Sequence, residues 1–405
     1  MAVFEIEALG AQGDGVAAGG VFAPFALPGE RVEGEVADGR VAAPTILEPS
    51  ADRVAPPCPH FGRCGGCALQ HASDAFLAGW KRDRIVAALA DRGIEGVEMR
   101  ETKTSPAGAR RRAVFAARRT KKTVEVGFHE RGSNLIVPLS ACPVLDPRLV
   151  DAIPAAVEAA RIGASRKGAI RATATLSEGG VDLAIEDAKP LEGPLAADAA
   201  ALAERFDLAR LAWNGEVVAL RRPPHQRFGA ALVSPPPGGF LQATAEGEAA
   251  LVAAAREAVA GARRVVDLFC GSGTLTLPLA AEAEAHGVEG EPAAIEAMLA
   301  GWRGAAGLKR VSGEARDLFR RPLLPLELSR FDAAVIDPPR AGAAAQSAAL
   351  AEGGPPLVAA LSCNPATFAR DARTLIDGGY RLDWVRPIDQ FRWSPHVELA
   401  ARFSR

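Results

Sequence analysis

The chain has 405 residues, of which 48% are hydrophobic and 24% charged, and its formal net charge is −2. The length allows two or three domains with cores of their own, and the composition excludes a disordered, collagen-like or coiled-coil protein. No run of about 18 apolar residues could span a membrane. The amino-terminal segment carries acids where a signal peptide carries basic residues. We therefore expect a cytoplasmic protein without a membrane partner, and nothing in the sequence indicates more than a monomer.

The first 50 residues alternate short β-like runs with glycine and proline, which predicts a small antiparallel β-barrel. The segment 26–32, ALPGERV, is where this stretch most resembles a TRAM domain, an OB-like module that binds RNA. The resemblance implies a shortened RNA-binding barrel at residues 1–50. A plain β-hairpin module is the alternative.

Cysteines gather in a segment rich in proline and glycine, residues 51–75. Cys58, Cys64 and Cys67 fall within ten residues, and Cys142, followed by proline, is a candidate fourth partner. A disulfide framework is not expected in a chain without an export signal, and four thiolates suit zinc or an iron–sulfur cluster. Zinc sites commonly contain two C-x2-C pairs, so the one pair here favours a cluster. Zinc and free thiols are the alternatives.

A helix is expected over residues 74–92, because apolar residues recur there at helical spacing and Ser73 is placed to cap it. Residues 100–131 contain ten Lys and Arg against three acids, a local charge of about +7. Such a surface suits the phosphates of nucleic acid. The alternative is an edge hairpin whose charge prevents aggregation. Residues 150–235 indicate a mixed α/β segment without a recognisable chemical motif.

The run PPPGG at residues 235–239 marks a candidate boundary, after which helices and apolar strands alternate as in a doubly wound parallel sheet. We therefore predict an α/β protein with three domains. These are an OB-like barrel at 1–50, a central mixed α/β domain at 51–235 that holds the cysteines and contacts RNA, and a doubly wound domain at 236–405. The helix near 74–92 is expected to pack on the last of these.

Residues 264–274 predict a buried strand, a glycine-rich turn and the start of a helix. Ligands of such sheets bind beyond the carboxyl ends of the strands, and Gly271 and Gly273 would let the backbone approach one closely. The pattern D-x-F-x-G-x-G is similar to the S-adenosylmethionine site of class I methyltransferases. Glu289 ends the next expected strand, where a carboxylate can accept hydrogen bonds from both ribose hydroxyls. The alternatives are Asp267 as a helix cap and Glu289 as a surface acid.

Two further strands are expected to end in reactive groups. Residues 331–336 lead to Asp337, and residues 357–361 lead to Cys363. Because the carboxyl ends of parallel strands share one crevice, these groups should meet beside the glycine-rich turn. A cysteine thiolate can add to carbon 6 of uracil, which makes carbon 5 nucleophilic toward an electrophilic methyl group. A base must then remove the proton from carbon 5, and Glu398 is the candidate for this role.

The chain resembles the RNA uracil-5-methyltransferase family over nearly its whole length. The segments that carry the resemblance are CGGCALQH (64–71), FLQ (240–242), DPPR (337–340), SCNP (362–365) and HVE (396–398). The resemblance implies Cys363 as nucleophile, Glu398 as base, and a 4Fe–4S cluster on Cys58, Cys64, Cys67 and Cys142. With the glycines of the turn, the residues expected around S-adenosylmethionine are Gln242, Phe269, Gly271, Gly273, Thr274, Glu289, Asp317 and Asp337.

We therefore expect an S-adenosylmethionine-dependent enzyme that methylates carbon 5 of a uridine in RNA. Members of this family with a cluster and a TRAM-like module more often modify 23S ribosomal RNA, so that RNA is favoured and the T-loop of tRNA is the alternative. An RNA-binding or assembly factor that keeps the fold is a second alternative. A third is an amino-methyltransferase, which also uses a D/N-P-P motif, but with tyrosine where Arg340 stands here.

Overall fold

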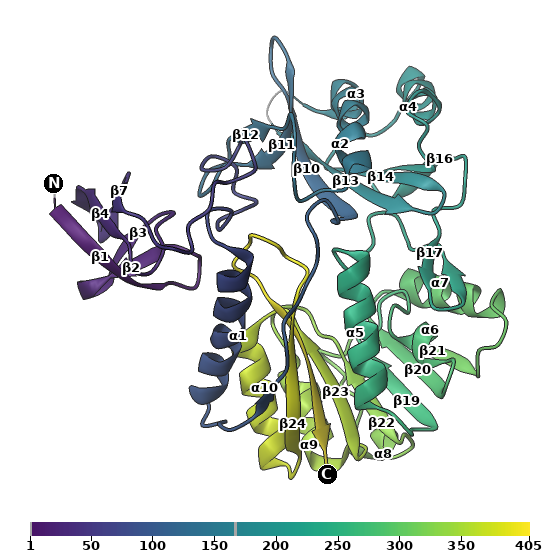
Figure 1. The fold of residues 1–405 in the computed structure, drawn as a ribbon. Helices are drawn as coiled ribbons and strands as arrows, with labels where there is room; N and C mark the ends of the chain where they lie inside the picture. Colours follow the sequence, from purple (N-terminus) through teal and green to yellow (C-terminus); the bar gives the residue numbers. More distant parts are fainter. Residues whose placement is uncertain (1, 166–167) are drawn as a thin grey trace.

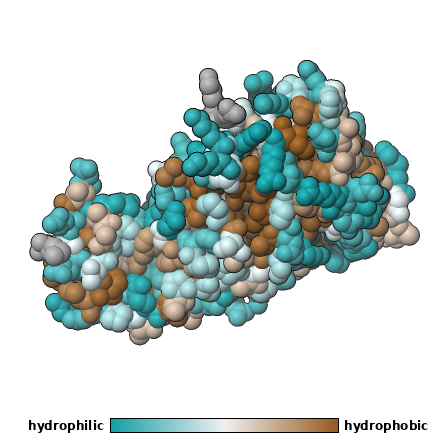
Figure 2. All heavy atoms as spheres, turned by 90° about the horizontal axis from the view of Figure 1, so that it is seen from above, coloured by the Kyte–Doolittle hydropathy of each residue, from teal (hydrophilic) through white to brown (hydrophobic). Residues whose placement is uncertain are grey.

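The computed structural model describes residues 2–165 and 168–405. Met1, in the predicted barrel, and residues 166–167, in the predicted central domain, lie outside the described residues. Figure 1 shows an amino-terminal sheet at one side, a central sheet with α2, α3 and α4 at the top, and a large sheet with most of the other helices below. Seen from above, the amino-terminal sheet protrudes as a lobe of its own (Figure 2). No helix in the described ranges has the length and apolar character that crossing a membrane requires.

The amino-terminal region is rich in short strands, as the sequence predicts. Its strands are β1 (Ala2–Leu9), β2 (Gly15–Ala17), β3 (Val21–Ala23), β4 (Arg31–Gly34), β5 (Val36–Ala37), β6 (Arg40–Val41) and β7 (Thr45–Glu48). They pair in the order β5-β6-β3-β2-β1-β4-β7 around a small core that contains Ile6, Val32 and Val41. An OB-like barrel stays a prediction for this region.

Helix α1 (Asp74–Ala90) confirms the expected helix, with its end two residues earlier than predicted. Ser73 caps it, because its Oγ accepts a hydrogen bond from the Phe76 backbone N–H at 3.2 Å. The buried face carries Leu77, Ile85 and Leu89. The helix packs against α10 (Pro365–Asp377) and β24 (Arg381–Asp389), and β8 (Glu98–Met99) and β9 (Lys103–Thr104) pair with β24. Part of the predicted central segment therefore belongs to the large sheet.

The central sheet has the order β12-β11-β10-β13-β14-β15-β16. Its elements are β10 (Arg112–Arg119), β11 (Val124–His129), β12 (Ile136–Pro138), α2 (Pro147–Asp151), α3 (Ile153–Gly163), β13 (Ala169–Ser177), β14 (Gly180–Glu186), α4 (Pro194–Arg205), β15 (Arg210–Trp213) and β16 (Glu216–Leu220). Small alanines on the buried faces of α3 and α4 allow these helices to lie close to the sheet. In the hairpin of β17 (Gln226–Phe228) and β18 (Ala231–Val233), β18 packs on α7 (Pro292–Arg303), so apolar contacts of the large sheet begin before residue 236. The predicted domain boundaries stay predictions.

The large sheet has the order β21-β20-β19-β22-β23-β25-β24-β8. Its other elements are α5 (Ala245–Ala258), β19 (Arg264–Leu268), α6 (Thr276–Leu279), β20 (Glu284–Glu289), α7 (Pro292–Arg303), β21 (Val311–Ala315), α8 (Pro325–Leu328), β22 (Ala333–Ile336), α9 (Ala344–Gly353), β23 (Leu357–Ser362) and β25 (Glu398–Ser404). Strands β19 to β23 run parallel, whereas β25 is antiparallel to both β23 and β24. The carboxyl ends of the parallel strands and the amino end of β25 therefore lie at one edge.

A buried ion pair joins α1 to the end of β24. Lys81 is 0% exposed, and its Nζ lies 2.6 Å from Asp389 Oδ1 and 3.1 Å from the Phe391 carbonyl oxygen. Burial lowers the pKa of Lys81, and the charge of Asp389 opposes that effect. The pair fixes a residue of the early chain to the turn that follows β24.

We expect Lys81→Met to lower the free energy of unfolding by about 3–5 kcal/mol, because it leaves the Asp389 carboxylate buried without its cation. Urea denaturation followed by circular dichroism measures this loss. The matched control is Lys103→Met, since Lys103 is about half-exposed and pairs with Glu101 at the surface. There the change should stay within about 0.5 kcal/mol. Equal losses of unfolding free energy in the two variants would contradict the assignment of a buried ion pair to Lys81 and Asp389.

Candidate active site

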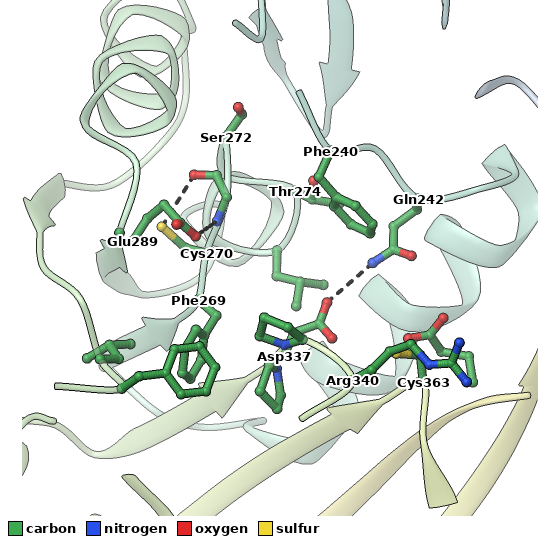
Figure 3. Close-up of a pocket in the computed structure, with 18 of the residues that line it drawn as sticks. Phe240, Gln242, Phe269, Cys270, Ser272, Thr274, Glu289, Asp337, Arg340 and Cys363 are labelled. Carbon is green, nitrogen blue, oxygen red and sulfur yellow. Dashed lines mark hydrogen bonds between the residues drawn. The ribbon is translucent and has the colours of Figure 1, made fainter. Parts of the chain in front are cut away.

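A cavity of about 480 Å³ opens at the carboxyl edge of the large sheet (Figure 3). Its lining comes from the ends of the parallel strands, the start of β25 and the segment before α5. Most of the predicted site residues line it, namely Gln242, Phe269, Gly271, Thr274, Glu289, Asp317, Asp337, Cys363 and Glu398. The topology therefore brings the predicted cofactor and catalytic residues into one space.

The turn after β19 is held in left-handed backbone conformations at Phe269 (φ 65°), Gly271 (φ 54°) and Gly273 (φ 91°). Gly271 lines the cavity and has open space beside it. Gly273 is not among the lining residues, and a Cβ there would lie 2.6 Å from Met298 Cγ. The second glycine of the motif therefore allows the turn to pack closely against α7.

Glu289, at the end of β20, is held by backbone N–H groups. Its Oε2 accepts a hydrogen bond from Gly271 at 3.0 Å, and its Oε1 accepts one from Glu291 at 3.1 Å. Each carboxylate oxygen has a further lone pair for a ligand hydroxyl. Asp317 lies at the rim with about half of its side chain exposed, and its Oδ1 accepts a hydrogen bond from the Phe319 backbone at 3.0 Å.

Cys363 and Glu398 lie next to each other across two paired strands. The antiparallel register of β23 and β25 places Ser362 opposite Leu399. Continuing that register by one residue places Cys363, just past the end of β23, beside Glu398, the first residue of β25. The pair depends on β25 running against its neighbours, because a parallel strand would place Glu398 at the far edge.

The turn that carries Cys363 is tied to the D-P-P-R segment. Asn364 Nδ2 donates a hydrogen bond to the Arg340 carbonyl oxygen at 3.0 Å, and Asn364 Oδ1 accepts one from the Ala366 backbone, which caps α10. The Arg340 guanidinium lies 3.2 Å from His396 Nδ1. Burial and the nearby Arg340 lower the pKa of His396 to about 4, so this imidazole is neutral at pH 7.

Burial also shifts the acids of the cavity. It raises the pKa of Asp337 to about 7, and burial together with the charge of Asp337 raises the pKa of Glu398 to about 8. Gln242 Nε2 donates to Asp337 Oδ2 at 3.3 Å, which favours the ionised acid (Figure 3). The pKa of Cys363 is raised to about 11 by burial and by the charges of Glu398 and Asp337. A positive charge placed in this cavity would favour the ionised form of each group.

Aromatic side chains outside the set of predicted site residues complete the cavity wall. Phe240 is 69% exposed and Phe319 is 52% exposed, although both are large apolar residues, and Phe391 also lines the cavity. The rings of Phe269 and Phe319 lie 5.4 Å apart. Phe240 could have been found as part of the F-L-Q segment. Phe319 and Phe391 leave no signal in the sequence, because their position depends on the shape of two turns.

The cysteines Cys58, Cys64, Cys67 and Cys142 line a second cavity, of about 260 Å³, between the cysteine-rich loop and the central sheet. Within the described part of the chain, no three His, Cys, Asp or Glu side chains are close enough together to hold a single metal ion. Burial and the neighbouring cysteine sulfurs raise the pKa of Cys67 to about 12.

The cysteine-rich loop also contacts the turn between β24 and β25. The backbone N–H groups of Ala68 and Leu69 both donate to the Trp393 carbonyl oxygen at 3.0 Å. Trp393 has a φ of 60°, which is unfavourable for a bulky residue. The residues just after Cys67 therefore help to hold the segment that leads into Glu398.

The basic side chains of residues 100–131 do not form one free surface. Several pair with carboxylates, namely Arg100, Lys103, Arg111, Arg118 and Arg131. Arg110 and Arg112 line the cysteine cavity. Arg119, Lys121 and Lys122 are exposed at the turn between β10 and β11.

Comparison with known proteins identifies the family. The chain is 45% identical to an uncharacterized RNA methyltransferase of Brucella suis, over 98% of this chain and 96% of that protein. It is 35% identical to the 23S rRNA (uracil(1939)-C(5))-methyltransferase RlmD of Alkalilimnicola ehrlichii, over 95% of this chain and 92% of that one. Residues 304–405 match the family model of tRNA (uracil-5-)-methyltransferases.

The chain belongs to the RNA uracil-5-methyltransferase family. The crystal structure of the Pyrococcus abyssi tRNA (uracil-54, C5)-methyltransferase, in complex with S-adenosyl-L-homocysteine, superposes with a TM-score of 0.77. The match covers 99% of this chain and 100% of that one, at 24% sequence identity. The two chains therefore share their fold along the whole length, which includes the α/β methyltransferase fold predicted for the carboxyl-terminal part.

The buried acids give a prediction for this methyltransferase without ligand. A folded state that raises the pKa of a carboxyl binds its proton more strongly than the unfolded chain does, so stability falls as pH rises through the raised pKa. We expect Glu398→Gln to be more stable than the wild type by about 0.5–2 kcal/mol at pH 8–9, and about equally stable below pH 5. Denaturant unfolding across this range measures the difference.

The control for this prediction is Glu352→Gln on α9, where the carboxyl is exposed. That variant should follow the wild-type pH dependence. If Glu398→Gln also followed the wild-type pH dependence, the Glu398 carboxyl would not be buried as described.

Proposed function

We propose that this protein transfers a methyl group from S-adenosylmethionine to carbon 5 of a uridine in RNA. The observation that carries the proposal is that Cys363 and Glu398, which adjoin the paired residues Ser362 and Leu399, line the same cavity as the glycine-rich turn. Membership of the uracil-5-methyltransferase family supports the same reaction.

The cavity fits the charge and shape of the methyl donor. S-adenosylmethionine supplies an electrophilic methyl group on a positively charged sulfur, which would offset the buried acids Asp337 and Glu398. Glu289 is placed to accept hydrogen bonds from the ribose hydroxyls, beside the open backbone at Gly271. Phe269 and Phe319 provide an apolar wall for a flat base, with Asp317 at its edge. Gln242 and Thr274 complete the proposed contacts.

The reaction follows from the two groups at the end of β23 and the start of β25. The Cys363 thiolate forms a bond to carbon 6 of the uracil, and the displaced electron pair makes carbon 5 nucleophilic. Carbon 5 takes the methyl group and still carries its proton, and the electron pair of the broken S–CH3 bond stays on the sulfur of the methyl donor. Glu398 then accepts that proton, the C5–C6 double bond forms again, and the bond between carbon 6 and Sγ breaks. Burial and the charges of Glu398 and Asp337 raise the pKa of Cys363, and the charge of Arg340 partly opposes that rise, in the direction that favours the thiolate.

The favoured substrate is 23S ribosomal RNA, supported by the 35% identity to the RlmD of A. ehrlichii. The uridine must leave its stack to reach Cys363, which costs roughly a few kcal/mol. The exposed cations at the β10–β11 turn, the cysteine-rich loop and the amino-terminal strands are the proposed contacts for the RNA backbone. A uridine in tRNA is the alternative substrate.

We also propose that the cysteine cavity holds a 4Fe–4S cluster. A space of about 260 Å³ bounded by thiols suits a cluster better than a single zinc ion, which needs its ligands about 2.3 Å from one centre. Arg110 and Arg112 would offset the negative charge of the thiolates. A bound cluster would link the cysteine-rich loop to Cys142 near the central sheet, and would thereby support the contact of Ala68 and Leu69 with Trp393.

Methyl transfer is tested with anaerobically purified protein, methyl-labelled S-adenosylmethionine, and RNA from cells that lack this protein. We expect label in 5-methyluridine from 23S ribosomal RNA, and none with Cys363→Ala. Ribosomal RNA and tRNA are separated, digested to nucleosides and analysed. Label in 5-methyluridine from tRNA would support the proposed reaction and show that the substrate is tRNA. Label on an amino group would overturn the reaction, and no label in either RNA would favour a binding factor.

The cluster proposal is tested by iron and sulfide analysis. We expect about four iron ions per chain in the wild type, a loss of most of the iron in Cys142→Ala, and no loss in Cys363→Ala. The two variants thus form a reciprocal pair, since Cys363→Ala should abolish methylation with the cluster in place. Zinc in place of iron, or equal iron in both variants, would contradict the cluster assignment.

A further inference from the structure

Gln390, directly after β24, is a buried residue that no motif identifies. It is 3% exposed and is not part of the cavity lining. Its side-chain Nε2 donates to Glu398 Oε2 and to Gln242 Oε1, each at 2.6 Å. Its Oε1 accepts from the Ala243 backbone N–H at 2.8 Å. One amide therefore contacts both the proposed base and a proposed cofactor residue.

The direction of these hydrogen bonds is fixed by chemistry. A backbone N–H can only donate, so the oxygen of Gln390 must face Ala243 and its NH2 group must face the two acceptors. Gln242 accepts through its oxygen, and this leaves its own NH2 group toward Asp337 Oδ2, at 3.3 Å. A reversal of the Gln390 amide would place like groups against each other at each of these contacts.

The position of Gln390 is constrained on both sides. Its neighbour Asp389 is held by the buried Lys81. Gly247, in the first turn of α5, faces Gln390 so closely that a Cβ would lie 2.6 Å from Gln390 Cβ and 3.0 Å from its Oε1. The side chain therefore has little freedom to swing away from Gln242 and Glu398.

We propose that Gln390 is a positioning residue that sets the proton acceptor Glu398 and the cofactor-side amide of Gln242 through one side chain. This inference rests on the proposed function. A hydrogen bond from Gln390 holds the Glu398 carboxylate beside Cys363 and favours its ionised form, against burial and the charge of Asp337. The other charged or titratable groups that line the same cavity are Cys363, Arg340, Glu289, Asp317 and Cys270.

The consequence concerns the last step of the reaction. In that step the proton of carbon 5 passes to Glu398, the C5–C6 double bond forms and the C6–Sγ bond breaks. When Glu398 loses its donor, it is displaced and more often protonated, so this step slows while the earlier steps continue. Methylated RNA then remains bonded to Cys363. Gln242, with its oxygen unpartnered, also holds Asp337 less firmly.

The test compares Gln390→Met, which keeps the length of the side chain and removes its hydrogen bonds, with Gln346→Met. Gln346 is an equally buried glutamine on α9 that bonds only to the Leu323 backbone among the contacts described. We expect Gln390→Met to lower kcat roughly 10–100-fold, to weaken S-adenosylmethionine binding, and to accumulate a denaturant-resistant protein–RNA adduct. The acidic limb of its pH–kcat profile should move to higher pH. Gln346→Met should change none of these.

The outcomes separate the two proposals. A wild-type protein that forms neither 5-methyluridine nor adduct would overturn the proposed function. An active wild type, with Gln390→Met matching Gln346→Met in adduct and pH profile, would overturn the role of Gln390. If Gln390→Met does not fold, Gly247→Ala replaces it, because the added methyl group displaces the intact amide. An unchanged adduct level and pH profile in Gly247→Ala would then count against the proposal.

Discussion

The ion pair between Lys81 and Asp389 holds the turn from which the proposed active site is assembled. Asp389 Oδ1 also accepts a hydrogen bond from the Phe391 backbone N–H at 3.0 Å, and Lys81 donates to the carbonyl oxygen of the same residue. The residues on both sides of Gln390 are thereby fixed. A buried pair of this kind gives little net stability compared with apolar packing. Its value here is geometric, since it determines where the chain leaves β24 and how it approaches Glu398.

The buried acids near the cavity lower the stability of the fold. Asp267, Asp337 and Glu398 are buried at one sheet edge, and burial raises the pKa of each acid. Asp267 is compensated by Thr276, whose hydroxyl donates to it at 2.6 Å, whereas the side-chain donors to Asp337 and Glu398 within the described residues are amides. Such an arrangement persists because the surrounding sheet is packed on both faces. A cation bound at this edge would relieve the repulsion between the acids.

The fold of the large sheet could be predicted because parallel strands buried on both faces leave continuous apolar runs, as at 333–336. Asp337 and Cys363 could be placed because parallel strands share a carboxyl edge. The antiparallel insertion of β25 could not be predicted, since either direction fits its apolar pattern. The same limit hides Gln390, whose partners are set by that strand order. At Gly273 the structure shows close packing against Met298, which the glycine-rich motif does not indicate, and its predicted cofactor contact stays a prediction.

Lys81 and Asp389 are 308 residues apart in the chain. At about 5–20 residues per second, the ribosome makes the second partner roughly 15–60 s after the first. During this interval α1 has no β24 to cover its apolar face, and Lys81 keeps a charge on that face. The segment with Gln390, Trp393 and Glu398 is made later still. The site therefore cannot close before residues 389–398 have been made, so a nascent chain that carries only the cysteine-rich loop and α1 has no completed catalytic edge.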